Sequence, residues 1–219
     1  MIGLFQPQAG NAELAAMAAA LADRRLDHGP RSAAFEAAFA THIGARPEQV
    51  PFLNSGTAGL FLAAELLGLR PGDEVVLPSP SFAAAANAVV RAGGRPVFRD
   101  VPARTIEAAV TPRTKAVVVL HYGGHPGDNA RIAARCRAAG RVLVEDCACS
   151  VASRVDGRAV GTFGDLAMRS FDAAKVLTTG DGRMLHVRDA ELAVQAGRLA
   201  YPGLVQPTGL GHARVPSRW

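Results

Sequence analysis

The feature that most constrains the fold of this chain is a regular alternation of short apolar segments with segments of helical periodicity. Predicted strands and the helices between them follow one another over residues 74–77, 82–92, 96–99, 116–121, 129–139 and 142–145. Strands that alternate with helices in this way form a mostly parallel sheet covered on both faces. The sequence therefore predicts an α/β fold, a three-layer sandwich with a mostly parallel sheet.

The N-terminal third contains two predicted helices, followed by a strand, a glycine turn and a third helix. Asn11 and Ser32 are predicted N-caps, because each precedes a segment with apolar residues on one face. Residues 50–54 then read as a short strand, residues 55–57 as a tight glycine turn, and residues 58–67 as an apolar helix. This segment is the first of the alternating strand and helix units in the chain.

The chain divides into three predicted parts. Residues 1–30 form an N-terminal helical segment, and residues 31–200 form the large domain. From residue 201 to residue 219, proline and glycine replace periodic apolar residues. We expect this last stretch to be the start of a truncated or missing C-terminal region.

Parallel sheets bind ligands at the carboxyl ends of their strands, which directs attention to the residues that follow each predicted strand. These residues are 54–57, 79–82, 121–124 and 146–149. The glycine turn, Phe82, His121 and Asp146 all fall in these four segments. The candidate site is therefore expected at one edge of the sheet.

Composition excludes several classes of protein. The chain has 219 residues, of which 49% are hydrophobic, enough for one large core. Its three cysteines are too few for a disulfide framework, so we expect free thiols and a cytoplasmic location. No leader or membrane span is expected. The net charge of +5 is spread along the chain without a basic run, so no nucleic-acid partner is expected.

Lysine is rare among the basic residues. Of 24 lysines and arginines, only Lys115 and Lys175 are lysines. An amine can be deprotonated and can attack a carbonyl group, whereas a guanidinium cannot, so a retained lysine indicates amine chemistry. This argument singles out two positions.

Four features at the strand ends match the needs of pyridoxal 5′-phosphate (PLP). Lys175 supplies an amine for the aldehyde, Asp146 an anion for the pyridine nitrogen, residues 55–57 a helix N-terminus for the phosphate, and Phe82 a flat group against the ring. Each feature alone has a simpler interpretation: a helix cap for the turn, core packing for Phe82, a cap for Asp146 and a solvated side chain for Lys175. The combination favours the cofactor.

Several motifs also occur in one fixed order: Asn54-Ser55-Gly56-Thr57-Ala58, Pro71-Gly72-Asp73-Glu74-Val75, Pro78-Ser79-Pro80-Ser81-Phe82, Thr111-Pro112-Arg113-Thr114-Lys115-Ala116, Glu145-Asp146-Cys147-Ala148, Ser170-Phe171, and Lys175-Val176-Leu177-Thr178-Thr179-Gly180. With these motifs the chain, from about residue 35 to residue 187, resembles the DegT/DnrJ/EryC1/StrS aminotransferases. That family has the PLP-dependent transferase fold type I. The pairing of the Asp146 and Lys175 motifs is most similar to the branch that aminates cyclitols and natural-product precursors.

The resemblance implies a role for each of these residues. Lys175 would carry the cofactor as a Schiff base and move the proton, and Asp146 would face the pyridine nitrogen. Phe82 would stack on the ring. The remaining cofactor-binding residues implied by the resemblance are Ser55, Gly56, Thr57 and Ser170 at the phosphate and Cys149 beside the phenolic oxygen.

The family transfers an amino group from glutamate or glutamine to a keto sugar linked to a nucleotide, or to a keto-cyclitol. It builds its site at a dimer interface, so the resemblance also implies a homodimer. A role in natural-product biosynthesis, such as that of an antibiotic amino sugar, follows from the branch.

The chain departs from the family at several positions. Cys149 stands where the family usually has glutamine, and a thiol is a poorer hydrogen-bond donor than an amide. Arg183 places a bulky cation after the lysine loop, where little space is expected. We expect the family's smaller C-terminal domain to be missing from this chain.

These departures leave two alternatives to amino-group transfer. One is another PLP reaction, such as elimination or decarboxylation of an amino-acid-like substrate. The other is a non-catalytic subunit that partners a longer homologue. A metal is not expected, because the spacing of Cys147 and Cys149, with His121 or His125 nearby in sequence, does not match a zinc site.

Overall fold

A computed structural model of the chain describes residues 9–24, 28–53, 56–100 and 109–200, and of Gly56 and Thr57 the backbone alone. Its centre is a sheet of seven strands in the order β1-β9-β8-β5-β4-β2-β3. The strands are β1 Phe52–Leu53, β2 Glu74–Pro78, β3 Arg95–Arg99, β4 Thr114–Leu120, β5 Val142–Asp146, β8 Leu166–Ser170 and β9 Arg183–Val187. Strands β3, β2, β4, β5 and β8 pair in parallel, whereas β9 is antiparallel to both of its neighbours. The predicted mostly parallel sheet is confirmed.

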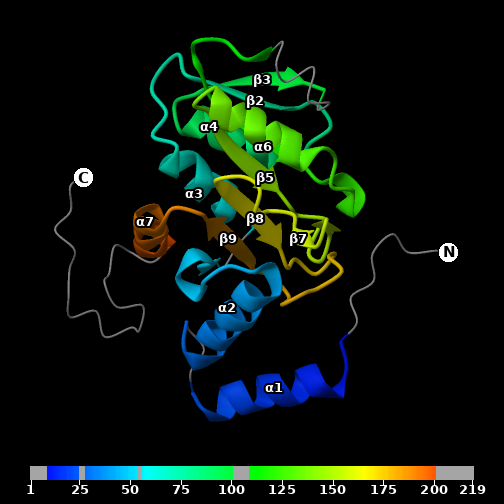
Figure 1. Cartoon of the computed structure of the whole chain (residues 1–219). Coiled ribbons are helices and arrows are strands. Elements are labelled where there is room, and N and C mark those ends of the chain that lie inside the picture. Colours follow the sequence, from blue (N-terminus) through cyan, green and yellow to red (C-terminus); the bar gives the residue numbers. More distant parts are fainter. Residues whose placement is uncertain (1–8, 25–27, 54–55, 101–108, 201–219) are drawn as a thin grey trace.

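Helices cover both faces of this sheet (Figure 1). Helices α3 Gly56–Leu66, α4 Ala83–Arg91 and α7 Ala190–Ala200 bury one face, and α6 Asn129–Ala138 packs on the other. The side chains of β2 alternate between the two layers: Val75 and Leu77 contact the first core, and Val76 contacts the second. This alternation follows from the period of two in a strand. The predicted three-layer sandwich is confirmed.

The N-terminal helices lie beyond the β9 side of the sheet (Figure 1). Helix α2 Pro30–Ile43 buries Phe39 and Ile43 against Phe171 and Met184. Helix α1 Asn11–Ala22 has no buried residue, and its predicted apolar face, Leu14, Met17 and Leu21, is exposed. The spacing of those residues predicted the helix correctly without indicating what covers it.

Both predicted N-caps are wrong by one or more residues. Gly10 is the N-cap of α1, where its N–H donates to the Glu13 carboxylate at 2.7 Å. Gly29 is the N-cap of α2, because Pro30 has the fixed φ that suits a first helical position. A glutamate three residues after the N-cap and an N-terminal proline are thus stronger signals here than a lone Asn or Ser.

Smaller elements complete the described part of the chain. They are the 3₁₀ turns η1 Pro47–Gln49 and η2 Tyr122–Gly124, and the antiparallel hairpin of β6 Arg154–Val155 and β7 Arg158–Ala159. All three cysteines are free. No helix in the described ranges has the length and apolar character needed to span a membrane. Residues 201–219, the predicted start of a C-terminal region, lie outside the described residues.

Candidate functional site

The predicted site residues gather at the carboxyl edge of the sheet. Asp146 ends β5, Ser170 ends β8, and His121 directly follows β4. These strands are parallel neighbours, so their last residues lie side by side at one edge. Lys175 lies in the loop of residues 171–182, which joins β8 to β9 at the same edge. Asp146 and Lys175 thus lie at the same edge of the sheet, close enough for the charge of Lys175 to lower the pKa of Asp146.

Asp146 is an almost fully buried carboxylate, with an exposed fraction of 2%. Burial raises the pKa of Asp146, and three influences oppose it: the N–H of Ala148, which donates to Oδ1 at 3.0 Å, the Arg183 guanidinium, and the charges of His121 and Lys175. A buried carboxylate with one described hydrogen bond is stabilised by a cation nearby. The site is therefore suited to a positively charged group facing Asp146.

Lys175 is half-buried and lies near a thiol. Its backbone N–H donates to the Asp172 carbonyl at 2.9 Å, which fixes the start of the loop turn. Its Nζ lies 4.0 Å from Sγ of Cys149, and its charge reaches Asp146. An amine, a thiol and a carboxylate therefore share one region, the carboxylate at the end of β5 and the thiol in the segment that follows it.

The other predicted residues differ in how fully the structure describes them. Phe82 is the N-cap of α4, directly after the turn that follows β2, and its side chain is 71% exposed. Ser170 is buried, and its Oγ accepts the N–H of Asp172 at 3.4 Å. Gly56 and Thr57 form the first turn of α3, so they belong to the helix rather than to a turn before it. Ser55 lies outside the described residues.

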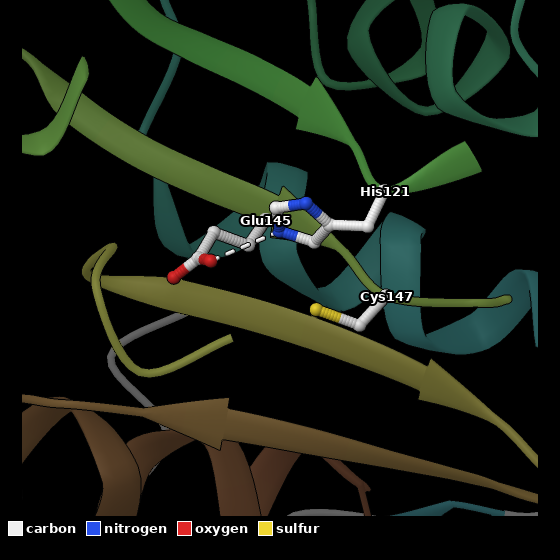
Figure 2. Close-up of side chains that lie close together, drawn as sticks. All are labelled: His121, Glu145 and Cys147. Carbon is white, nitrogen blue, oxygen red and sulfur yellow. Dashed lines mark hydrogen bonds and ion pairs between the residues drawn. The ribbon is translucent and has the colours of Figure 1, made fainter. Parts of the chain in front are cut away.

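A second buried group lies on the opposite face of β5; sequence reasoning considered His121 and Cys147 for a metal site but did not assign Glu145 to it. Figure 2 shows His121, Glu145 and Cys147 pointing toward one another, with His121 Nε2 3.0 Å from a Glu145 oxygen. The other partners of Glu145 are the backbone N–H groups of Gly161 and Gly164. Burial acts to raise the pKa of Glu145, but these hydrogen bonds outweigh it and the pKa is lowered.

This group has a structural explanation. Its ligand atoms lie within 4.8 Å of one another, the range of a metal site. Both oxygens of Glu145 already accept hydrogen bonds, and burial raises the pKa of the Cys147 thiol well above its usual range. Through these hydrogen bonds, Glu145 holds the loop that precedes β8 against strand β5. The signal in the sequence was an acid inside an apolar strand, one residue before Asp146 and hence on the other face.

Arg183 occupies a place where the sequence suggested little space. It is the first residue of β9, and its side chain is half-buried. The neighbouring helix α3 comes close here at Gly59, where a Cβ would lie only 2.9 Å from Cγ of Met168. The same Cβ would lie 4.0 Å from Cβ of Arg183, an ordinary contact, so glycine at position 59 lets α3 approach Met168.

Comparison with known proteins identifies relatives for most of the chain. The family model of the DegT/DnrJ/EryC1/StrS aminotransferases matches residues 7–213. The whole chain is 55% identical to a dTDP-4-dehydro-2,3,6-trideoxy-D-glucose 4-aminotransferase from Saccharopolyspora spinosa and spans 59% of that protein.

Comparison with solved structures also identifies aminotransferases as similar proteins. TlmJ, an aminotransferase from Streptoalloteichus hindustanus, is 56% identical with a TM-score of 0.91, over 94% of this chain and 58% of TlmJ. A Streptococcus pneumoniae protein solved in its PLP form is 25% identical with a TM-score of 0.77, over 87% of this chain and 54% of that protein. The predicted fold, the large domain of PLP-dependent transferase fold type I, is thus confirmed. The chain belongs to the DegT/DnrJ/EryC1/StrS aminotransferase family.

Proposed function

We propose that this chain is the cofactor-binding part of a PLP-dependent aminotransferase that acts on a keto sugar linked to a nucleotide. One observation carries the proposal: a buried carboxylate, Asp146, and an amine, Lys175, meet at the carboxyl edge of a fold type I sheet. The relative from S. spinosa, named for a dTDP-linked 4-dehydro sugar, favours a sugar nucleotide over a cyclitol. Because the chain spans 59% of that relative, the activity of the whole protein is part of the proposal.

The described residues fit this cofactor in their chemistry. When bound, PLP supplies an aldehyde that captures amines and a ring that takes up the electron pair released as a C–H bond breaks. Lys175 Nζ would hold the cofactor through its aldehyde and would serve as the base that moves the substrate proton. Asp146 would hold a protonated ring nitrogen, because a buried carboxylate is stabilised by a cation.

The remaining contacts are proposed from position. The backbone N–H groups of Gly56 and Thr57, in the first turn of α3, and the hydroxyl of Ser170 would bind the phosphate. Ser55, which precedes Gly56 in the sequence, is proposed for the same role. Phe82 offers an exposed ring that can cover one face of the cofactor. Cys149, near Lys175, lies beside the phenolic oxygen.

Further parts of the proposal concern the surroundings of the chain. We propose glutamate or glutamine as the amino donor. The product would be an amino sugar that becomes part of a natural product such as an antibiotic. The working assembly would be a homodimer. Three free thiols favour a cytoplasmic location.

The first test is chemical trapping. Borohydride reduction of the chain with PLP should fix the cofactor to Lys175, because reduction makes the carbon–nitrogen bond permanent. Peptide mass spectrometry gives the position, and Lys115, the other lysine, is the internal control. Labelling of Lys115, or of neither lysine, contradicts the proposal.

The same experiment distinguishes amino transfer from the two alternatives. Glutamate or glutamine added before borohydride should abolish the label, since amino transfer leaves the cofactor as an amine that borohydride cannot reduce. An elimination or decarboxylation restores the aldehyde, so Lys175 would remain labelled. A non-catalytic subunit would show labelling that no donor affects.

A further inference from the structure

Arg183 reaches into the candidate site from a strand that the proposed roles do not use. It lies opposite Ser170 in the antiparallel register of β8 and β9. Its Nη1 lies 3.2 Å from the sulfur of Met168, and Met168 is the register partner of Asp146 on β5. The guanidinium therefore extends from β9 across β8 toward Asp146, on one face of the sheet.

The contacts of Arg183 leave much of its donor capacity unused. A guanidinium has five N–H donors, and the hydrogen bond described for Arg183 goes to sulfur, a weak acceptor. Its Nε is buried and has no hydrogen-bond partner among the described residues. Burial lowers the pKa of Arg183, and Asp146 is the first of the three carboxylates that oppose this. The charge of Asp146 therefore acts on a guanidinium whose described hydrogen bond is weak.

Asp146 has few other sources of positive charge. The charged groups whose fields lower its pKa are Arg183 from β9, His121 after β4, and Lys175 from the loop after β8. His121 contacts Glu145 on the opposite face of β5, and Cys147 remains a protonated thiol there because burial raises its pKa. Lys175 is also the amine that PLP consumes. Arg183 is therefore the cation that stays beside Asp146 whether or not the cofactor is attached.

We propose that Arg183 is a positioning residue that acts through Asp146, supplying the permanent positive charge that keeps this buried carboxylate ionised at the ring-nitrogen position. The pairing of the two residues is a property of the chain itself. Its consequence for the cofactor rests on the proposed function. With Arg183 present, Asp146 is shared between the guanidinium and the ring nitrogen, so the proton on that nitrogen is held less strongly than by an unshared carboxylate.

The dependence of stability on pH follows from the raised pKa of Asp146. Below the usual pKa of aspartate, Asp146 is protonated in both the folded and the unfolded chain, and its ionisation does not lower the stability of the fold. As pH rises, the unfolded chain loses its proton first, so stability is lost until pH passes the folded pKa. Removing Arg183 raises that folded pKa further. The loss of stability caused by Arg183→Met should therefore be largest at neutral pH and become smaller as pH falls.

The experiment measures urea unfolding of the cofactor-free chain across this pH range. Arg183→Met should raise the unfolding equilibrium constant about tenfold more at neutral pH than at acid pH, the equivalent of a pKa shift of about one unit. In the background of Asp146→Asn, that pH-dependent difference should disappear. Arg183→Lys, which keeps the charge, should restore most of the stability lost in Arg183→Met. Arg31→Met removes an exposed arginine in a surface ion pair and controls for net charge.

A second measurement reads the same pairing through the cofactor. The pH titration of the ring nitrogen in bound PLP, followed by absorbance, should move to higher pH in Arg183→Met, because Asp146 then serves that nitrogen alone. A pH-independent loss of stability, or an equal loss in the Asp146→Asn background, shows a packing role only and overturns the inference. A chain that binds PLP and shows the Arg183 effect without amino transfer refutes the proposed function and leaves the pairing intact.

Discussion

Cys149 differs from the other two cysteines in its surroundings. Cys136 and Cys147 are buried, and burial raises the pKa of both thiols, that of Cys136 to about 11. Cys149 is partly exposed and lies 4.0 Å from the amine of Lys175. Thiol reactivity requires both access and a thiolate, so the three positions should react very differently.

We expect iodoacetamide to alkylate Cys149 first in the folded chain at neutral pH. Bound PLP should slow this reaction, because the cofactor attached to Lys175 would cover the thiol. Mass spectrometry of the alkylated peptides, with and without PLP, measures both effects, and the denatured chain gives the reference in which all three cysteines react. Equal rates with and without PLP would place the cofactor away from Cys149.

Single residues were predictable where their role depends on a position at a strand end. Asp146 and Phe82 lie where expected, because an apolar strand followed by a polar or aromatic residue can be recognised within a few positions. Glu145 and Arg183 were not assigned roles from sequence. The role of Glu145 depends on the backbone of Gly161 and Gly164, and that of Arg183 on the register between β8 and β9. Such contacts leave no local pattern.

At the scale of elements, the loop that leads into β8 depends on one side chain. Glu145 accepts the N–H groups of Gly161 and Gly164, which hold this loop against β5. A Cβ at Gly161 would lie 2.5 Å from Nη2 of Arg169, and φ of Gly161 is 79°, so the loop follows a path that glycine permits. The entry of β8, and with it the position of Ser170, therefore rests on a buried carboxylate.

Glu145→Gln should destabilise the chain by about 1–3 kcal/mol, since the amide nitrogen of glutamine faces a backbone N–H that then lacks an acceptor. The measurement is the urea midpoint, together with hydrogen exchange at the amides of Gly161 and Gly164, which should become faster. Glu48→Gln, in an exposed ion pair with Arg46, is the matched control and should change stability little. Unchanged exchange at both glycines would contradict the anchoring role.

The type of most elements was predictable, and the direction of one strand was not. Apolar runs such as that of β4 indicate a buried strand whichever way it runs. The reversal of β9 results from the loop of residues 171–182, which returns the chain at the same edge instead of crossing the sheet with a helix. Helix α7 was not predicted, although its first-turn Glu191 and its apolar positions are helical signals.

At the scale of the whole molecule, large apolar side chains are exposed around the site. Phe82, Tyr122 and Val176 are each more than 70% exposed, and all three follow strands at the carboxyl edge. Exposed apolar groups that gather around a site indicate a surface that another molecule covers. In the proposed homodimer, a second copy of the chain would cover them.

We expect light scattering to show a dimer whose population rises with protein concentration and with added PLP, since a ligand bound across an interface favours the assembly by mass action. Val176→Glu should weaken this association, because it places a charge on the apolar surface. Val90→Glu, at a similarly exposed valine on α4, is the control and should leave it unchanged. A chain that stays monomeric at all concentrations yet transfers amino groups would refute the dimer.

The pairing of β1 with β9 sets an order of events during protein synthesis. Phe52 lies opposite Met184, and Phe39 and Ile43 of α2 pack on Phe171 and Met184. A ribosome delivers α2 and β1 early, but their partners appear only after most of the described chain has been made. During that interval the aromatic and aliphatic side chains of residues 35–52 contact one another but lack Phe171 and Met184, which complete their cluster. The core beside α2 can therefore be completed only after β9 has emerged.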